Sequence, residues 1–208
     1  MLSGFSLLVL GFLLGLRHAL DPDHVVAVAA IVARHPSVVT AARVGALWGL
    51  GHSATILAVG GVIAWFRVSV AEGVAQALEF GVALMLVAIG VTNLRTTEGH
   101  HASPARPALV GMMHGLAGSA AVALLVLATV SDARQALAYL AVFGLGTIVA
   151  MTAVTAAMAV PLRAASDRLS SARRGLLAVS GWASIAVGLW LAVTLAMDAG
   201  LLGRAAAP

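Results

Sequence analysis

A group of ionisable residues lies inside a long apolar stretch near the start of the chain. The segment reads Arg17-His18-Ala19-Leu20-Asp21-Pro22-Asp23-His24, and apolar residues continue on both sides of it. Ionisable side chains are expensive inside a bilayer, so those found there usually pair with one another or bind something. Neutral imidazoles together with carboxylates suit nickel, cobalt, zinc or iron(II). His18, Asp21, Asp23 and His24 are therefore candidate metal ligands.

Pro22 decides how these side chains can meet. On a straight helix Asp23 points away from the surface shared by His18, Asp21 and His24. Pro22 has no N–H to donate to the carbonyl of His18, so we expect the helix to break near Pro22. The break would swing Asp23 and His24 toward His18 and free the His18 carbonyl as an extra ligand.

His52 is the next candidate ligand, in the segment Gly49-Leu50-Gly51-His52-Ser53. Small residues beside it would let two helices approach closely. At 1.5 Å per residue from the expected cytoplasmic ends, His52 lies about 12 Å deep, His24 about 14 Å and His18 about 22 Å. These depths allow the three histidines to converge. The alternative for His52 is a hydrogen bond across a helix interface.

Other polar residues carry weaker signals. His114 lies about 8 Å from the same face and has no carboxylate near it in sequence, so it is an auxiliary ligand, a gate or a helix-packing residue. Glu72, Gln76 and Glu79 form one stripe that could gather cations or simply be a solvated helix start. The tract Glu98-Gly99-His100-His101 could capture metal weakly.

The elements that must position these residues belong to a membrane protein. The 208 residues are 61% hydrophobic and 10% charged, whereas a soluble domain has about 25% charged residues. No cysteine is present, so nitrogen and oxygen atoms must hold any metal. All twelve basic residues are arginines that form no amphipathic basic face, which argues against a nucleic-acid partner. The partners expected are a lipid bilayer and a metal ion, with no prosthetic group, and a homo-oligomer remains open.

We predict an all-α polytopic membrane protein with about six transmembrane helices, because a span needs about 20 apolar residues. The first run would measure roughly 48 Å as one helix, so it must tilt, break or re-enter. This run also resembles a signal peptide, but it lacks a basic start. We expect it to remain uncleaved in the mature protein. The apolar runs are Leu2–Ala33, Val44–Phe66, Val74–Leu94, Leu109–Val130, Ala136–Val160 and Leu176–Leu201.

The arginines predict the orientation in the membrane. Eight lie in or near the loops after the first, third and fifth runs, and three lie on the other side. The positive-inside rule then places the first group in the cytoplasm and both termini outside. We expect a multi-pass protein of the inner membrane.

The two halves of the chain resemble each other. Gly15–Leu20 matches Gly111–Leu116, and Trp48–His52 matches Phe143–Thr147, both at a separation of about 95 residues. Three helices per copy would invert the second copy in the membrane, an arrangement common in transporters. We therefore expect one membrane domain over residues 1–208, with repeats over about 1–95 and 108–208 and a loop at 96–107. The alternative is chance similarity between helices rich in glycine and leucine.

A family resemblance rests on three motifs. The first is His18-x-x-x-x-Asp23-His24, preceded by Arg17, and the second is Leu50-Gly51-His52-Ser53. Together they resemble the signature of the NicO-type nickel/cobalt transporter family. The stretch His114–Ala120 resembles its UreH-like, urease-accessory branch. The resemblance implies transport of nickel(II) or cobalt(II) without ATP hydrolysis across a bacterial or archaeal inner membrane. This chain is shorter than the larger members, with six expected helices against about eight.

The leading hypothesis is accordingly a secondary permease for uptake of nickel(II) or cobalt(II), not an enzyme. The chain contains no lysine and no phosphate-binding loop, in agreement with transport that needs no nucleotide. An intramembrane zinc-dependent hydrolase is one alternative, in which Ser53 lies near three histidines, although no His-Glu-x-x-His motif is present. Metal efflux, or an accessory role in urease or hydrogenase maturation, is another.

Overall fold

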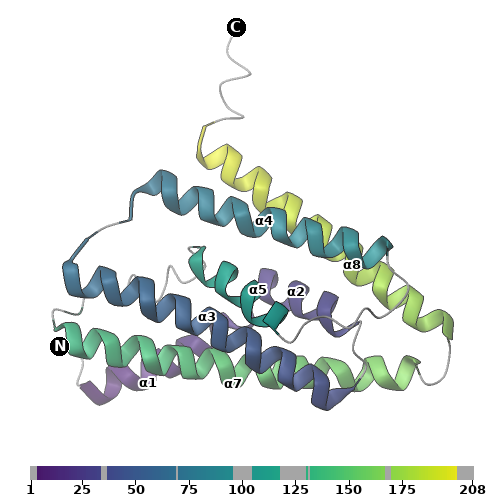
Figure 1. Cartoon of the computed structure of the whole chain (residues 1–208), viewed down its shortest axis with the longest axis horizontal. Coiled ribbons are helices and arrows are strands. Elements are labelled where there is room, and N and C mark those ends of the chain that lie inside the picture. The colour runs from purple at the N-terminus through teal and green to yellow at the C-terminus, as the bar shows by residue number, and fades with distance from the viewer. Residues whose placement is uncertain are drawn as a thin grey trace, which may run out of the picture.

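A computed structural model describes residues 4–33, 37–68, 70–95, 105–117, 130, 132–166 and 170–200. Within these ranges every regular element is a helix (Figure 1). The helices are α1 (Gly4–His18), α2 (Pro22–Val32), α3 (Val38–Phe66), α4 (Glu72–Arg95), α5 (Ala105–Leu116), α7 (Ala133–Ser166) and α8 (Ser170–Asp198).

Several of the described helices have the length and composition of membrane spans. Among the described residues, α3, α4, α7 and α8 could each cross a bilayer, and the bent pair α1 and α2 could form a fifth span. The prediction of a polytopic helical membrane protein is confirmed. The fourth expected run, Leu109–Val130, begins in α5, but its residues 118–129 lie outside the described part of the chain.

The predicted break near Pro22 is confirmed, with a different local structure from the one expected. The helix ends at His18 and a new one starts at Pro22, bent by 54°. Pro22 is the first residue of α2, where a missing N–H costs nothing, and Asp21 before it is extended. The His18 carbonyl accepts the N–H of Asp21 at 3.0 Å. Our expectation that this carbonyl would be freed was wrong, because the chain turns instead of kinking.

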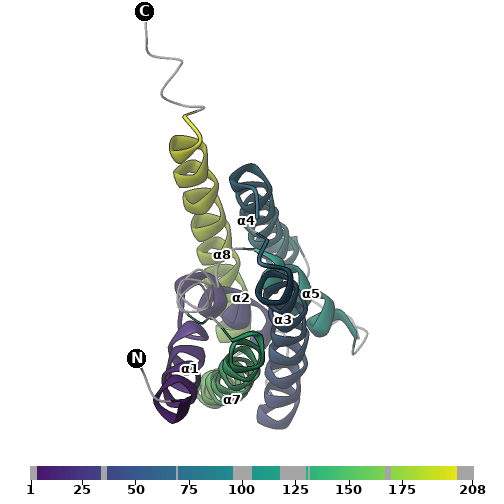
Figure 2. The same ribbon diagram turned by 90° about the vertical axis from the view of Figure 1, so that its left-hand side faces the viewer.

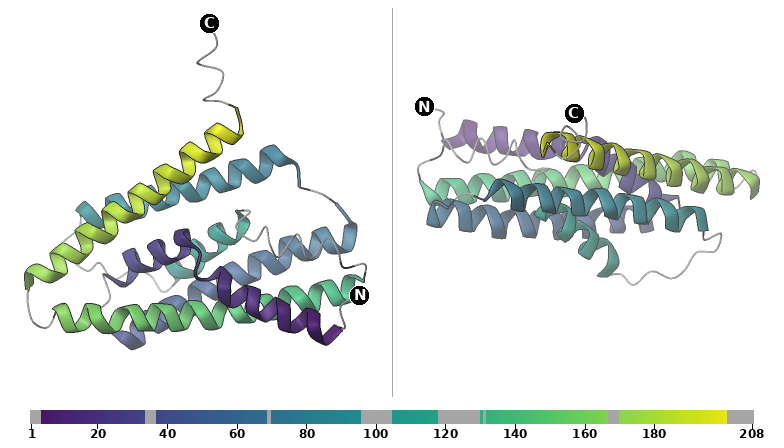
Figure 3. Two further views of the ribbon diagram at one scale, coloured as in Figure 1. Left: turned by 180° about the vertical axis from the view of Figure 1, so that it is seen from behind. Right: turned by 90° about the horizontal axis from the view of Figure 1, so that it is seen from above.

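Two antiparallel helices form the centre of the molecule. The colours in Figure 1 show α3 and α7 running side by side in opposite directions, with α1 packed along α7 and α5 along α3. The helices α4 and α8 form a second antiparallel pair, visible from behind in Figure 3. The end-on view in Figure 2 shows this pair set apart from α1, α3 and α7. Contacts of α2 with α4 and α8 help to join this pair to the other helices.

The two halves of the chain make matching contacts. Gly15 of α1 lies against the backbone of Phe143 in α7, and Gly111 of α5 lies against the backbone of Trp48 in α3. In each case the backbone is too close for a Cβ atom. Gly15 and Gly111 are about 95 residues apart, and so are Trp48 and Phe143. This is the separation of the internal similarity. Each half therefore packs its short helix on the long helix of the other half in the same way.

The close approach at Gly15 yields a test of this packing. We expect Gly15→Ala to lower the free energy of unfolding by about 1–3 kcal/mol, because the added methyl group meets the Phe143 carbonyl. Gly81 in α4 has open space where a Cβ would be, so Gly81→Ala is the matched control and should be neutral or stabilising by up to about 1 kcal/mol. Thermal unfolding of the detergent-purified variants measures both. Equal stability of the two would show that α1 and α7 are not tightly packed.

Candidate metal site

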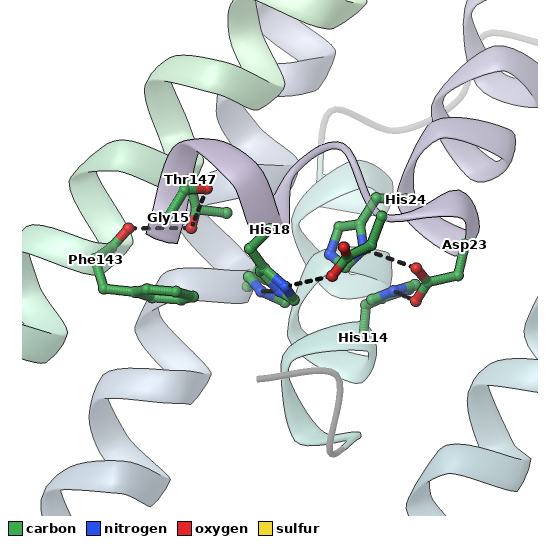
Figure 4. Close-up of polar contacts among 9 residues, drawn as sticks. Gly15, His18, Asp23, His24, His114, Phe143 and Thr147 are labelled. Carbon is green, nitrogen blue, oxygen red and sulfur yellow. Dashed lines mark hydrogen bonds and ion pairs between the residues drawn. The ribbon is translucent and has the colours of Figure 1, made fainter. Parts of the chain in front are cut away.

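Four histidines from four helices meet near the middle of the molecule. His18 ends α1, His24 lies in the first turn of α2, His52 lies within α3, and His114 lies near the end of α5. All four are buried. Figure 4 shows His18 and His24 close to each other and the ring of His114 directed toward Asp23. The break between α1 and α2 allows this convergence, since it places His24 beside His18 with 4.5 Å between ring centroids.

His18 and His52 bring two imidazole nitrogens close together. Their Nε2 atoms lie 3.0 Å apart. Two nitrogens that each bind one ion at about 2.1 Å and at a right angle stand about 3.0 Å from each other. His24 completes the group, because one ligand atom from each of the three residues lies within 4.8 Å of the others. The convergence expected from their depths along the helices is thus present.

Asp23 joins two of the histidines. Its Oδ2 lies 2.7 Å from Nε2 of His114, and its Oδ1 lies 3.2 Å from Nδ1 of His24. A carboxylate accepts hydrogen bonds, so this contact favours a proton on Nδ1 of His24 and leaves the lone pair on Nε2. That Nε2 is buried and has no hydrogen-bond partner among the described residues. A metal-binding histidine commonly donates its second N–H to a carboxylate in this way.

Asp21 contacts His18 in the same manner. Its Oδ2 lies 2.9 Å from Nδ1 of His18, which leaves Nε2 of His18 facing His52. The side chain of Asp21 is 41% exposed, whereas that of Asp23 is 18% exposed. The two aspartates that the sequence predicted as ligands thus contact Nδ1 atoms, Asp21 that of His18 and Asp23 that of His24. Neither aspartate contacts the Nε2 atom of these two rings. Asp23, His24 and His114 also form a second group whose ligand atoms lie within 4.8 Å.

Aromatic rings form walls around the histidines. Trp48 stacks near His24 with 6.3 Å between centroids and lies 5.8 Å from His114. Phe143 lies 5.4 Å from His18. These apolar walls replace water around the imidazoles. Trp48 and Phe143 were not predicted to lie at the site, although they begin the two matching segments of the internal similarity.

The two halves carry different side chains at the position of His52. The counterpart of His52 in the second half is Thr147. Its hydroxyl lies 3.0 Å from the carbonyl oxygen of Phe143 and 3.3 Å from that of Gly15, so it satisfies backbone groups (Figure 4). Ser53, considered for a hydrolase, donates to the carbonyl of Gly144 in α7. The cluster is therefore built mainly from the first half, with His114 as the contribution of the second.

The remaining predicted residues lie elsewhere. Glu72 is exposed at the start of α4, and Gln76 and Glu79 are partly buried further along it. None of the three belongs to either histidine group. The tract Glu98–His101 lies outside the described residues.

Comparison with known proteins decides the family. Residues 4–99 match the model of the NicO family, described as high-affinity nickel-transport protein. The chain is 31% identical over 216 residues to the urease accessory protein UreH of Bacillus sp. (strain TB-90), with 94% of each chain covered. The chain belongs to the NicO family. No solved structure matches it.

Membership in the NicO family places the chain among transport proteins for metal ions and not among enzymes. The intramembrane hydrolase is thereby set aside. The matched range contains His18, Asp21, Asp23, His24 and His52, while His114 lies beyond it.

The contacts of the two aspartates predict different effects on metal affinity. We expect Asp23→Ala to weaken nickel binding by roughly 10–100-fold, because it removes the partner of both His24 and His114. Asp21→Ala should weaken binding less, since Asp21 contacts one histidine from a more exposed position. Equilibrium titration of the purified variants with nickel(II) measures both. A larger loss for Asp21→Ala would reverse this ranking.

Proposed function

We propose that this protein is a secondary transporter that carries nickel(II) or cobalt(II) into the cell across the inner membrane. The observation that carries the proposal is the buried meeting of four histidines from α1, α2, α3 and α5 in a NicO-family chain. In the proposed site His18, His24 and His52 bind the ion through Nε2. Asp21 and Asp23 hold the imidazoles from behind, and His114 anchors Asp23.

The driving force proposed is the membrane potential. An inside-negative potential favours entry of a divalent cation by roughly 4.6 kcal/mol per 100 mV. Uptake driven by this free energy requires no nucleotide, and the sequence contains no phosphate-binding loop. The ion would exchange its water molecules for imidazole nitrogens in the buried cluster, ligands that suit nickel and cobalt.

We further propose that the chain forms six spans as two inverted three-helix repeats, over about residues 1–95 and 108–208. The antiparallel course of α3 and α7 supports inversion (Figure 1). The matched contacts of Gly15 on Phe143 and of Gly111 on Trp48 support repetition. The cluster lies where the halves meet, and rocking of one half against the other would expose it alternately to each side.

The orientation proposed follows from the arginines at the two ends of the bundle. Arg43, Arg95, Arg163 and Arg174 lie near helix ends on one side, and only Arg67 and Arg134 lie near helix ends on the other side in the described part of the chain. The first side would face the cytoplasm. Both termini would then lie outside.

The similarity to a urease accessory protein supports a second candidate role, an accessory function in metal delivery to an enzyme. A metal-binding accessory protein that does not transport would share the buried cluster. Flux through the purified chain alone distinguishes the two roles, because an accessory protein binds nickel without accumulating it inside vesicles.

Removal of single histidines tests the transport proposal. In proteoliposomes with an inside-negative potential, we expect nickel and cobalt accumulation to be lost in His18→Ala, His24→Ala and His52→Ala. His114→Ala should retain part of the activity, because it acts on the ion through Asp23. Thr152→Ala removes a polar side chain of α7 that donates to the carbonyl of Ile148 and belongs to neither histidine group, and it serves as the control. Normal flux in a folded His52→Ala variant would exclude His52 from the ion's path.

A further inference from the structure

A cavity of about 300 Å³ lies between α2, α4 and α8. Its walls carry three carboxylates, Asp21 and Asp23 from the start of α2 and Glu79 from α4. Val82, Val187 and Trp190 are among the apolar residues that line the rest. A carboxylate-lined hollow with apolar walls concentrates cations, because low-dielectric walls focus the field of the charges.

The cavity ends at the histidine cluster. Asp21, which lines it, contacts Nδ1 of His18 at 2.9 Å, and Asp23, which also lines it, contacts His114 at 2.7 Å. The two aspartates are therefore a common wall between the cavity and the cluster. Glu79 is the one carboxylate of the cavity that does not contact a cluster histidine, so its role is separate from holding the site together.

The cavity lies in the half of the bundle that we assign to the outer side. Glu79 lies about 10 Å from the Glu72 end of α4, and Trp190 lies about 12 Å from the Asp198 end of α8, at 1.5 Å per residue. These two helix ends lie at the same end of the molecule (Figure 1). The cavity thus lies between the cluster and that end of the molecule, with Glu79 and Trp190 about 10–12 Å inside the helix ends.

The other end of the same three helices is joined by buried hydrogen bonds. The side-chain amide of Asn93 in α4 donates to the carbonyl of Ala30 in α2 at 2.7 Å and to Oγ of Ser180 in α8 at 3.3 Å. Ser184 of α8 donates to the carbonyl of Leu86 in α4 at 2.7 Å. The helices are therefore held together toward the cytoplasmic end and enclose a hollow toward the outer end.

We propose that this cavity is the outer vestibule through which the divalent cation reaches the histidines, and that Glu79 is its capture residue. The inference rests on the proposed transport function and adds a residue outside the cluster to the path. Glu79 attracts the hydrated ion and transfers it to the wall formed by Asp21 and Asp23. A single carboxylate holds such an ion weakly, so the ion moves on to the imidazoles, which nickel and cobalt prefer.

Replacement of Glu79 tests the capture role. In proteoliposomes we expect Glu79→Gln to raise the nickel concentration for half-maximal uptake by about tenfold while the maximal rate is kept, since field focusing acts on the encounter. Glu72→Gln is the matched control, because it removes the same charge from the exposed start of the same helix, away from the cavity. Equal behaviour of the two variants would overturn the capture role, and a lost maximal rate in Glu79→Gln would assign Glu79 to a later step.

Thiol labelling tests the vestibule without any transport. The chain contains no cysteine, so an introduced one is the sole target of a thiol reagent. We expect Val187→Cys, in the cavity wall, to react with a charged, membrane-impermeant thiosulfonate added outside, and nickel(II) to slow the reaction. Leu189 lies two residues away, and its side chain is 54% exposed on the face of α8 that lipid would cover. We therefore expect Leu189→Cys to be shielded from the reagent.

The labelling outcome separates this inference from the proposed function. If Val187→Cys reacts only from the cytoplasmic side, or not at all, while the wild type carries nickel, the vestibule is wrong and transport stands. If Val187→Cys reacts from outside and the wild type carries no nickel, the cavity is open to the outside but is not a transport path, which also overturns the inference. Outside labelling together with nickel flux supports it.

Discussion

The carboxylate of Asp23 is the contact on which the centre of this protein depends. It lies within hydrogen-bond distance of His24, its neighbour in α2, and of His114 in α5, 91 residues away. Charge-assisted hydrogen bonds of this kind are stronger than those between neutral groups, and a low-dielectric interior strengthens them further. A single side chain thereby fixes the ring of His24 and joins the first half of the chain to the second. The proposed ligand geometry therefore depends on both contacts of Asp23.

Such a polar centre requires close packing around it. Buried polar groups without partners are costly, so four histidines can share one place only if the backbones carrying them approach closely. Glycine supplies that approach where Gly15 meets Phe143 and where Gly111 meets Trp48. The aromatic residues at these contacts also face His18 and His114. The packing between the halves and the walls of the cluster are therefore made by the same residues.

Much of this arrangement could be predicted from the sequence. The cost of charge in a bilayer singled out His18, Asp23 and His24, and depth along the helices allowed His52 to join them. The contact of His114 with Asp23 could not be predicted, because Asp23 lies in α2 and the sequence around His114 contains no carboxylate. The local structure at Pro22 was also misjudged, since a proline that interrupts one helix can equally begin the next. Which of the two occurs depends on how α2 packs on α4 and α8, and tertiary contacts of that kind leave no local pattern.

The charges of the proposed site explain why it would suit a divalent ion. Three neutral imidazoles add no charge of their own, so a bound doubly charged cation is balanced by the carboxylates of Asp21 and Asp23 behind them. A loaded site of this composition is neutral, and a neutral site avoids the large cost of moving net charge through a low-dielectric region. A monovalent ion would leave one negative charge uncompensated, and a trivalent ion one positive charge. In the proposed site the two aspartates, placed behind the ligands, would thus set the charge of the cargo, and the imidazole nitrogens would set its chemical type.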